Sequence, residues 1–313
     1  MSIAGIDRPA TPTDWEGRND GPGPEHARWH SVVSPLSVAA ADPGVALIGF
    51  ASDEGVRRNG GRVGAAAGPA ALRAALGGLA VHDSRPRYDA GDVITQGTDL
   101  ESAQERLSDA VAELTAAGHT VIALGGGHET AWATHRGLRR THPNAVQIVN
   151  LDAHFDLREA DEPTSGTPFL QIAGLVGEEE FRYCVLGISE PNNTRVLFDT
   201  AQRLSVRTVT DNEIEEMGAA GVAELVSSLA AKAEHLHLSI DLDGLPAAVA
   251  PGVSAPAAVG IALSAYRAAV RAAAASGKLR LVDVVELNPR FDLDARTART
   301  AARLIEDIAG ALG

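Results

Sequence analysis

The stretch VQIVNL (146–151), followed directly by DAHFD (152–156), decides the fold of this chain. Its first half is a short apolar run, typical of a strand that is buried on both faces of a parallel sheet. Its second half places three metal-ligand side chains, Asp152, His154 and Asp156, at alternate positions. Alternate side chains of an extended backbone point to the same side, so all three are aimed together from the end of the strand.

Five further apolar runs predict strands of the same kind. They are VALIGF (45–50), TVIAL (120–124), YCVLGI (183–188), LHLSI (236–240) and RLVDVVEL (280–287). Alanine- and leucine-rich stretches between them predict helices, at 69–76, 101–118, 221–234, 264–277 and 296–313. This alternation predicts an α/β fold with three α/β/α layers and a mostly parallel sheet.

The composition predicts one domain over residues 1–313, with residues 1–44 as an N-terminal extension that packs on the core. The 32 glycines and 16 prolines are spread along the chain and form no linker. The first residues contain no basic start followed by an apolar stretch and no bilayer-spanning segment, so we expect a cytoplasmic protein without a membrane partner. The one cysteine, Cys184, cannot form an internal disulfide, and its apolar surroundings favour a buried, inert thiol.

The formal net charge of −14 argues against nucleic acid and against anionic membranes as partners. Both require clustered Lys and Arg side chains that displace counterions. A small anionic substrate is compatible with this charge, because bound cations or a local positive group can reverse the sign inside a pocket.

Two other predicted strands end in comparable side chains. Gly125-Gly126-Gly127-His128-Glu129 follows the strand at 120–124, and Asp241-Leu242-Asp243 follows the strand at 236–240. Ligands of α/β sheets bind beyond the carboxyl ends of the strands, so we expect the candidate ligands to meet there. The predicted metal ligands are His128, Asp152, His154, Asp156, Asp241 and Asp243.

The charge of this set favours two metal ions. Four aspartates crowded together cannot all stay ionised without counter-charge, and two divalent cations would supply it. Oxygen ligands with two imidazoles suit Mn²⁺, although Zn²⁺, Fe²⁺, Co²⁺ and Ni²⁺ are compatible. Asp-X-Asp alone is usually a turn or helix cap, but the three motifs together are far more specific. The other eight histidines are interpreted as surface or packing residues.

The motifs GGGHE (125–129), NLDAHFDLR (150–158) and SIDLDGLPAAVAPG (239–252) resemble the metal motifs of the ureohydrolases, which comprise arginases, agmatinases and formimidoylglutamases. The resemblance to the formimidoylglutamase branch is closer, because it extends to further stretches. Among these are DWEGRND (14–20), GFASDEGVRRNGGRVGAAAGP (49–69), TSGTPF (164–169), NNTR (192–195) and ELNPRFD (286–292). It implies a homo-oligomeric hydrolase with two Mn²⁺ per subunit that cleaves N-formimidoyl-L-glutamate to L-glutamate and formamide in histidine degradation.

The resemblance also implies roles for individual residues. One metal would bind His128, Asp152, Asp156 and Asp241, and the other would bind Asp152, His154, Asp241 and Asp243. Asp152 and Asp241 would therefore bridge the two ions. Glu286 would face the cationic amidine of the substrate. We expect Asp156, as the second catalytic residue, to accept a hydrogen bond from the nucleophilic water that the cations acidify.

The two carboxylates of such a substrate need hydrogen-bond donors. Two loops that we expect at the mouth of the active site carry suitable side chains, and the guanidinium of Arg matches a carboxylate well. The predicted substrate-binding residues are Arg57, Arg58, Asn59 and Arg62 in one loop, with Asn193 and Arg195 in the other.

Two positions depart from the family pattern. Gly244 follows Asp243 where valine is expected, and Phe169 is the nearest counterpart of a histidine that shuttles protons in arginase. The second departure argues against guanidino substrates. The alternatives are a guanidino-compound ureohydrolase of the guanidinobutyrase, agmatinase or arginase type, which would release urea, and a non-catalytic metal-binding scaffold without turnover.

Overall fold

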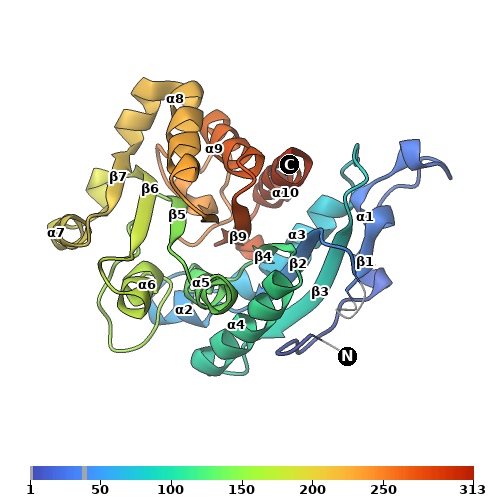
Figure 1. Cartoon of the computed structure of the whole chain (residues 1–313), viewed down its shortest axis with the longest axis horizontal. Coiled ribbons are helices and arrows are strands. Elements are labelled where there is room, and N and C mark those ends of the chain that lie inside the picture. The colour runs from blue at the N-terminus through green and yellow to red at the C-terminus, as the bar shows by residue number, and fades with distance from the viewer. Residues whose placement is uncertain (1–2, 37–40) are drawn as a thin grey trace.

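Nine parallel strands form one sheet in the computed structural model, which describes residues 3–36 and 41–313 (Figure 1). Their order across the sheet is β1-β3-β2-β4-β9-β8-β5-β6-β7. The strands are β1 (Val33–Pro35), β2 (Val45–Ala51), β3 (Arg87–Ile94), β4 (Thr120–Leu124), β5 (Val146–Leu151), β6 (Arg182–Ile188), β7 (Arg207–Thr210), β8 (His235–Asp241) and β9 (Leu279–Val285). All neighbouring pairs are parallel, which confirms the predicted fold class.

Helices cover both faces of the sheet (Figure 1). One layer consists of α3 (Gly68–Gly77), α8 (Asp211–Ala231), α9 (Leu263–Ala275) and α10 (Arg296–Ala311), and the other of α4 (Leu100–Ala116), α5 (Thr130–Thr141) and α6 (Pro168–Val176). The described chain also contains α1 (Trp29–Val32), α2 (Glu54–Arg58) and α7 (Arg195–Arg203). Among the helices of residues 3–36 and 41–313, none is long and apolar enough to cross a membrane.

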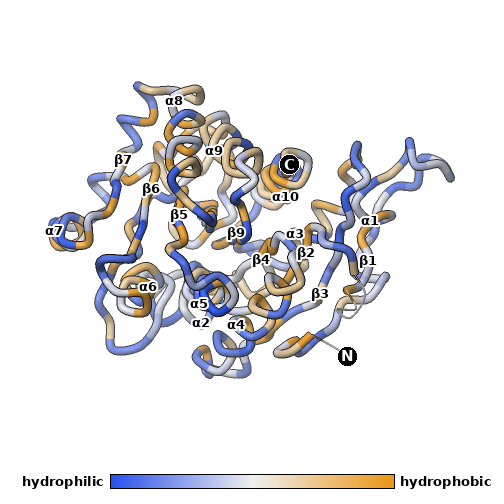
Figure 2. The backbone as a smooth tube through the Cα atoms, in the orientation of Figure 1, coloured by the Kyte–Doolittle hydropathy of each residue, from blue (hydrophilic) through white to orange (hydrophobic). Residues whose placement is uncertain are grey.

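The spacing of apolar residues along the strands and helices explains why helices pack on both faces of the sheet. In β2, Val45 and Leu47 pack into the core beneath α3 and α10, whereas Ile48 and Phe50 pack into the core beneath α4. A strand covered on both faces is apolar at every position, which is why these runs are continuous. The helices are instead hydrophobic on one face, so orange and blue alternate along them in Figure 2.

The sequence analysis missed β3, because its polar residues obscure the strand pattern. Asp89 and Asp92 are buried in β3, where Arg73 of α3 binds both carboxylates. The Arg73–Asp89 pair is bidentate, at 2.7 and 2.9 Å, and Nη1 lies 2.7 Å from Asp92 Oδ1. The sequence analysis also did not name β1, β7, the helices α5, α6 and α7, or the first half of α8, whose backbone leaves helical geometry at Gly218.

The N-terminal segment binds to the same strand. Arg8 Nε donates to Asp92 Oδ2 at 2.9 Å, and Trp15 Nε1 donates to Asp89 Oδ2 at 2.9 Å. Trp29 is fully buried and β1 pairs with β3 at the sheet edge. Residues 1–2 and 37–40 of the expected extension lie outside the described residues. The described part thus packs against the core through ion pairs, aromatic burial and one edge strand.

Substitution of Arg73 tests the importance of this buried pairing. Arg73→Met leaves two buried carboxylates without their main counter-charge, so we expect the free energy of unfolding to fall by about 3–5 kcal/mol. Urea denaturation followed by circular dichroism measures the change. Arg299→Met is the matched control, because Arg299 is exposed on α10 with no side-chain partner among the described residues, and it should change stability by less than about 0.5 kcal/mol. Equal effects of the two substitutions would contradict the interpretation.

Candidate metal centre

Four adjacent central strands end at the same edge of the sheet and carry the site. His128 follows β4, Glu286 follows β9, Asp241 ends β8 and Asp152 follows β5. In the sheet, β9 and β8 lie between β4 and β5, which are consecutive in the chain. Open α/β sheets bind ligands at such a change of strand order, so the topology itself brings these side chains together.

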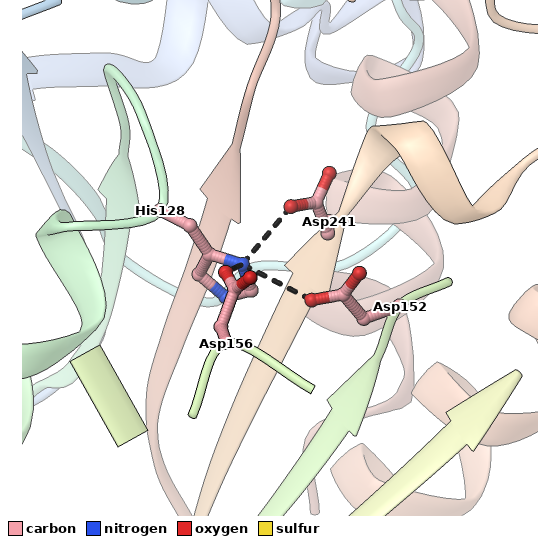
Figure 3. Close-up of side chains that lie close together, drawn as sticks. All are labelled: His128, Asp152, Asp156 and Asp241. Carbon is pink, nitrogen blue, oxygen red and sulfur yellow. Dashed lines mark ion pairs between the residues drawn. The ribbon is translucent and has the colours of Figure 1, made fainter. Parts of the chain in front are cut away.

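The first group of candidate ligands surrounds one imidazole nitrogen. His128 Nδ1 lies 3.2 Å from an oxygen of Asp152, 2.9 Å from one of Asp156 and 2.9 Å from one of Asp241 (Figure 3). Despite these distances, Nδ1 has no hydrogen-bond partner of acceptable geometry among the described residues. Three carboxylates that converge on one imidazole nitrogen without a hydrogen bond of acceptable geometry are arranged as ligands of a cation, and the donor types suit Mn²⁺.

A second group overlaps the first. Asp152, His154 and Asp243 offer atoms close enough together for one ion. His154 Nδ1 lies 3.5 Å from Asp152 Oδ1 and 3.3 Å from Asp243 Oδ2. The other oxygen of Asp243 is buried without a hydrogen-bond partner among the described residues. Asp152 belongs to both groups, as expected of a bridging ligand.

Asp241 belongs only to the first group. Its Oδ1 accepts the backbone N–H of Asp243 at 2.8 Å, which leaves Oδ2 to face His128. The structure thus brings all six predicted ligands into two overlapping groups, whereas the bridging role of Asp241 stays a prediction.

Burial makes the carboxylates of this cluster hard to ionise. Burial raises the pKa of Asp241 well above its ordinary value, and the nearby carboxylates of Asp243 and Asp152 raise it further. The pKa of Asp156 is also raised, first by burial and then by Asp152. Asp152 differs, because the nearby imidazoles of His128 and His154 outweigh its burial and lower its pKa. The carboxylates of this centre can therefore all ionise only when positive counter-charge is bound beside them.

The imidazoles respond in the opposite direction. Burial alone would lower the pKa of His128, but the surrounding carboxylates raise it well above its ordinary value. The carboxylate of Asp243 raises the pKa of His154 to about 12 against the effect of burial. Since an imidazole binds metal in its neutral form, metal binding must release these protons.

Outer contacts orient the candidate ligands. The Nε2 of His128 lies 3.0 Å from the hydroxyl of Ser239, and the amide of Asn150 donates to Asp152 Oδ2 at 3.0 Å. Phe169 is fully buried, packs edge-on against the His128 ring and stacks on Tyr183. Phe169 therefore fixes a ligand ring and is not part of the cavity wall. Such outer partners hold ligands in their binding orientation.

The two candidate catalytic residues have strained backbones. Asp156 and Glu286 have φ angles of 48° and 68°, in the left-handed region. Such conformations cost about 1–3 kcal/mol each and persist only where neighbours fix them. Glu286 is fixed because its N–H donates to Gly126 O at 2.8 Å and its Oε1 accepts the N–H of His128 at 2.9 Å. A side chain at Gly126 would collide with the carbonyl of Ser52, which explains the glycine there.

The departure at Gly244 also has a physical reason. A Cβ at this position would collide with the hydroxyl of Tyr266. That hydroxyl lies 2.8 Å from the carbonyl oxygen of Asp241 and 3.2 Å from that of Leu151. These carbonyls belong to the ends of β8 and β5. Gly244 therefore makes room for a tyrosine that ties together the two strands carrying most of the candidate ligands.

A cavity opens over the two ligand groups. Its walls include His154, Asp156, Asp241, Asp243 and Glu286, together with Asn59, Gly61, Arg158, Ser165, Asn193, Leu197, Ser254 and Ala255. Of the predicted substrate-binding residues, Asn59 and Asn193 line this cavity. The amide of Asn193 donates to Ala153 O at 2.8 Å and Ser189 O at 2.9 Å, so it supports the ligand loop.

The four predicted arginines, Arg57, Arg58, Arg62 and Arg195, do not line the cavity. Arg57 and Arg58 pair with Glu54, and Arg58 also binds Glu101 and the carbonyl of Thr98.

The other two arginines also lie away from the cavity wall. Arg62 binds the backbone carbonyls of Val253 and Ser254, and Arg195 is exposed at the start of α7. The carbonyls that bind Arg62 come from a distant part of the chain, so the sequence around Arg62 did not reveal them.

The arginine on the cavity wall is one that the sequence analysis did not single out. Arg158 extends the alternation of Asp152, His154 and Asp156 by one more step, and this spacing was the available signal. Ser165 and Ser254 also line the cavity, but nothing in their local sequence distinguishes them from other loop serines.

Metal binding should stabilise the fold through this cluster. We expect saturating Mn²⁺ to raise the Tm, because a ligand that binds only the folded state stabilises it. Asp241→Asn should abolish most of that increase. Without added metal, the same substitution should not lower the Tm, since it removes a charge that burial disfavours. Differential scanning calorimetry with Mn²⁺ and with chelator measures both effects, and an undiminished Mn²⁺ response in the variant would refute the ligand assignment.

The contact between Gly244 and Tyr266 allows a double-substitution test. Tyr266→Phe should weaken Mn²⁺ binding by about 10–100-fold, the usual effect of losing an outer partner. Gly244→Val should be poorly tolerated alone and better tolerated together with Tyr266→Phe, because the colliding oxygen is then absent. Calorimetric titration with Mn²⁺ and thermal melts of the three variants measure this coupling. Strictly additive changes in Tm and Mn²⁺ affinity would show that a side chain at position 244 does not collide with the hydroxyl of Tyr266.

A family model and similar curated proteins agree on the relatives of this chain. A family model described as "Arginase family" matches residues 43–310. The formimidoylglutamase of Corynebacterium efficiens is 53% identical over 301 residues, covering 96% of this chain and 95% of that protein. The formimidoylglutamase of Nocardia farcinica is 52% identical over 298 residues, covering 94% and 95%.

Solved structures are similar over most of the chain. The crystal structure of Trypanosoma cruzi formiminoglutamase with Mn²⁺ has a TM-score of 0.78 at 30% identity and covers 85% of this chain and 92% of that one. The formimidoylglutamase from Bacillus subtilis shares the fold, with a TM-score of 0.82 at 23% identity over 91% of each chain. With a family model matching most of its length and relatives of this similarity, the chain belongs to the arginase family.

Proposed function

We propose that this protein hydrolyses N-formimidoyl-L-glutamate to L-glutamate and formamide with two Mn²⁺ per subunit, a reaction of histidine degradation. The relatives named formimidoylglutamase, which cover nearly the whole chain, support the activity. The Mn²⁺ in the T. cruzi structure supports the choice of metal. The proposed metal ligands are His128, Asp152, His154, Asp156, Asp241 and Asp243, which the fold brings into two overlapping groups.

The observation that carries this proposal is the position of Glu286. Glu286 is 5% exposed and lines the same cavity as members of both ligand groups. The backbone N–H of His128 holds one carboxylate oxygen, which leaves the other for a ligand. Burial raises the pKa of Glu286 well above its ordinary value, with Glu129 and Asp243 contributing. A cationic amidine would relieve this unfavourable charge by pairing with the carboxylate.

The chain's own groups divide the remaining tasks. When bound, two divalent cations lower the pKa of water and polarise the electrophile. Asp156 accepts the proton of the attacking water, a role supported by its place on the cavity wall and by its carboxylate oxygen 2.9 Å from His128 Nδ1. Glu286 orients the amidine so that water adds to the formimidoyl carbon. The bond between that carbon and the glutamate nitrogen then breaks, the oxygen remains in formamide, and the nitrogen leaves as the amine after gaining a proton.

We also propose a cytoplasmic homo-oligomer. The lone Cys184 is buried, and burial raises the pKa of its thiol to about 12. The fold therefore does not depend on a disulfide, which would require an oxidising compartment. Membership of the arginase family supports self-association. Size-exclusion chromatography with light scattering measures the assembly.

Substrate selectivity separates this function from the guanidino-hydrolase alternative. We expect kcat/KM for N-formimidoyl-L-glutamate to exceed that for arginine, agmatine and guanidinobutyrate by roughly 10⁴ or more. The reason is that the guanidino compounds would leave polar groups of the site without their hydrogen-bond partners. The guanidinium carbon bears three nitrogens and is the poorer electrophile. Formamide detected by NMR and urea detected by colorimetry distinguish the products. Comparable urea release from any guanidino compound would favour the alternative, and no turnover of any substrate would favour the scaffold.

A further inference from the structure

We propose that Arg158 binds the distal carboxylate of the substrate and thereby selects an amidine that carries a terminal acid. The inference rests on the proposed function, which supplies the substrate, but it assigns a residue and a specificity that the overall activity does not. Four observations carry it: the position of Arg158, its lack of a side-chain partner among the described residues, the packing of its side chain against Gly166, and the charge of the cavity.

Arg158 lines the cavity whose wall includes members of both ligand groups. It lies two residues beyond Asp156, and its backbone N–H donates to the carbonyl of Gly166 at 2.9 Å. This bond fixes the base of the side chain, whereas the side chain itself is exposed at the rim. The residue therefore joins the buried centre to the solvent.

The guanidinium of Arg158 has no hydrogen bond or ion pair with any of the described residues. Glu159, Asp161 and Glu162 line a neighbouring hollow together with Arg158, but among the described residues no ion pair joins any of them to its guanidinium. Arg58 shows the contrast, because its guanidinium is bound by Glu54 and Glu101 and is nearly buried. An arginine on the cavity wall with free donors can bind a carboxylate in a bidentate manner.

Gly166 leaves the space in which the side chain lies. A Cβ at Gly166 would stand 2.8 Å from Arg158 Cδ, 3.3 Å from Arg158 Nε and 3.2 Å from Asn59 Oδ1. Arg158 and Asn59 therefore flank one glycine, and both line the cavity. The neighbouring Ser165 donates its N–H to Gly55 O at 3.1 Å, which ties this loop to the start of α2.

The charge of the cavity identifies the kind of ligand. The ionisable residues of its wall are four candidate metal ligands, Glu286 and Arg158. If the metals balance the aspartates and Glu286 pairs with the amidine, Arg158 is the positive group left for a second charge on the substrate. The α-carboxylate sits on the carbon that bears the reacting nitrogen and must stay near the metals. The γ-carboxylate is two methylene groups farther out, so the exposed Arg158 is placed for the distal acid.

Matched substrates separate the two carboxylates. N-formimidoyl-L-norvaline replaces the distal carboxylate by methyl, and N-formimidoyl-γ-aminobutyrate removes only the α-carboxylate. Each is assayed for formamide with the Mn²⁺-loaded wild type, Arg158→Met, Arg158→Lys and the surface control Arg299→Met. Metal content and thermal melts confirm that the variants are loaded and folded.

The expected result is a selective loss. Arg158→Met should lower kcat/KM by about 10–100-fold, mainly through KM, for the two substrates that keep the distal carboxylate. It should leave the norvaline compound unchanged, and Arg158→Lys should recover part of the loss. An equal loss on all substrates, no loss on the glutamate compound, or a loss that depends only on the α-carboxylate would each overturn the proposal.

Product binding gives a readout that does not depend on turnover. Calorimetry should show that Arg158→Met weakens binding of L-glutamate to the Mn²⁺-loaded protein and leaves L-norvaline binding unchanged. Failure of the proposed function looks different, because the wild type itself would release no formamide. Equal binding of L-glutamate by wild type and variant would overturn the assignment of Arg158 alone.

Discussion

The carboxylates of Asp152, Asp241 and Asp243 are buried beside the half-buried carboxylate of Asp156, and their mutual repulsion is the constraint on which the rest of the structure depends. Burial without counter-charge disfavours ionisation, as the raised pKa values of three of the four show. The central strands can hold this cluster because both faces of the sheet are packed with apolar side chains. The stability of that core offsets a site that is unfavourable in the absence of cations.

The same constraint explains where the backbone is strained. Asp156 and Glu286 adopt left-handed conformations at the ends of β5 and β9, where each must turn its side chain toward the ligand groups. Glycines relieve the crowding nearby, at Gly126 beside the carbonyl of Ser52 and at Gly244 beside the hydroxyl of Tyr266. The unexpected glycine after Asp243 is therefore one half of a pair, and its partner lies in α9, where no local motif could reveal it.

The sequence predicted the fold and the centre to the extent that their causes are local. Apolar runs located six strands, alternate spacing located five candidate ligands, and a glycine run after a strand located His128, because all these patterns depend on neighbours in the chain. The strand β3 escaped because Asp89 and Asp92 are neutralised by Arg73, which lies in another element. Partners that meet only after folding cannot be read from spacing.

The arginines illustrate this limit in functional terms. Arg58 and Arg158 both follow a strand end and both have acidic residues nearby in the sequence, so local sequence predicts a substrate carboxylate equally well for either. The fold separates them, because Arg58 is saturated by Glu54 and Glu101 whereas Arg158 keeps its donors on the cavity wall. In a chain with an excess of acidic residues, most arginines find internal partners. An arginine that remains unpaired beside a buried metal-ligand cluster is thus more informative about the substrate than the number of arginines near the site.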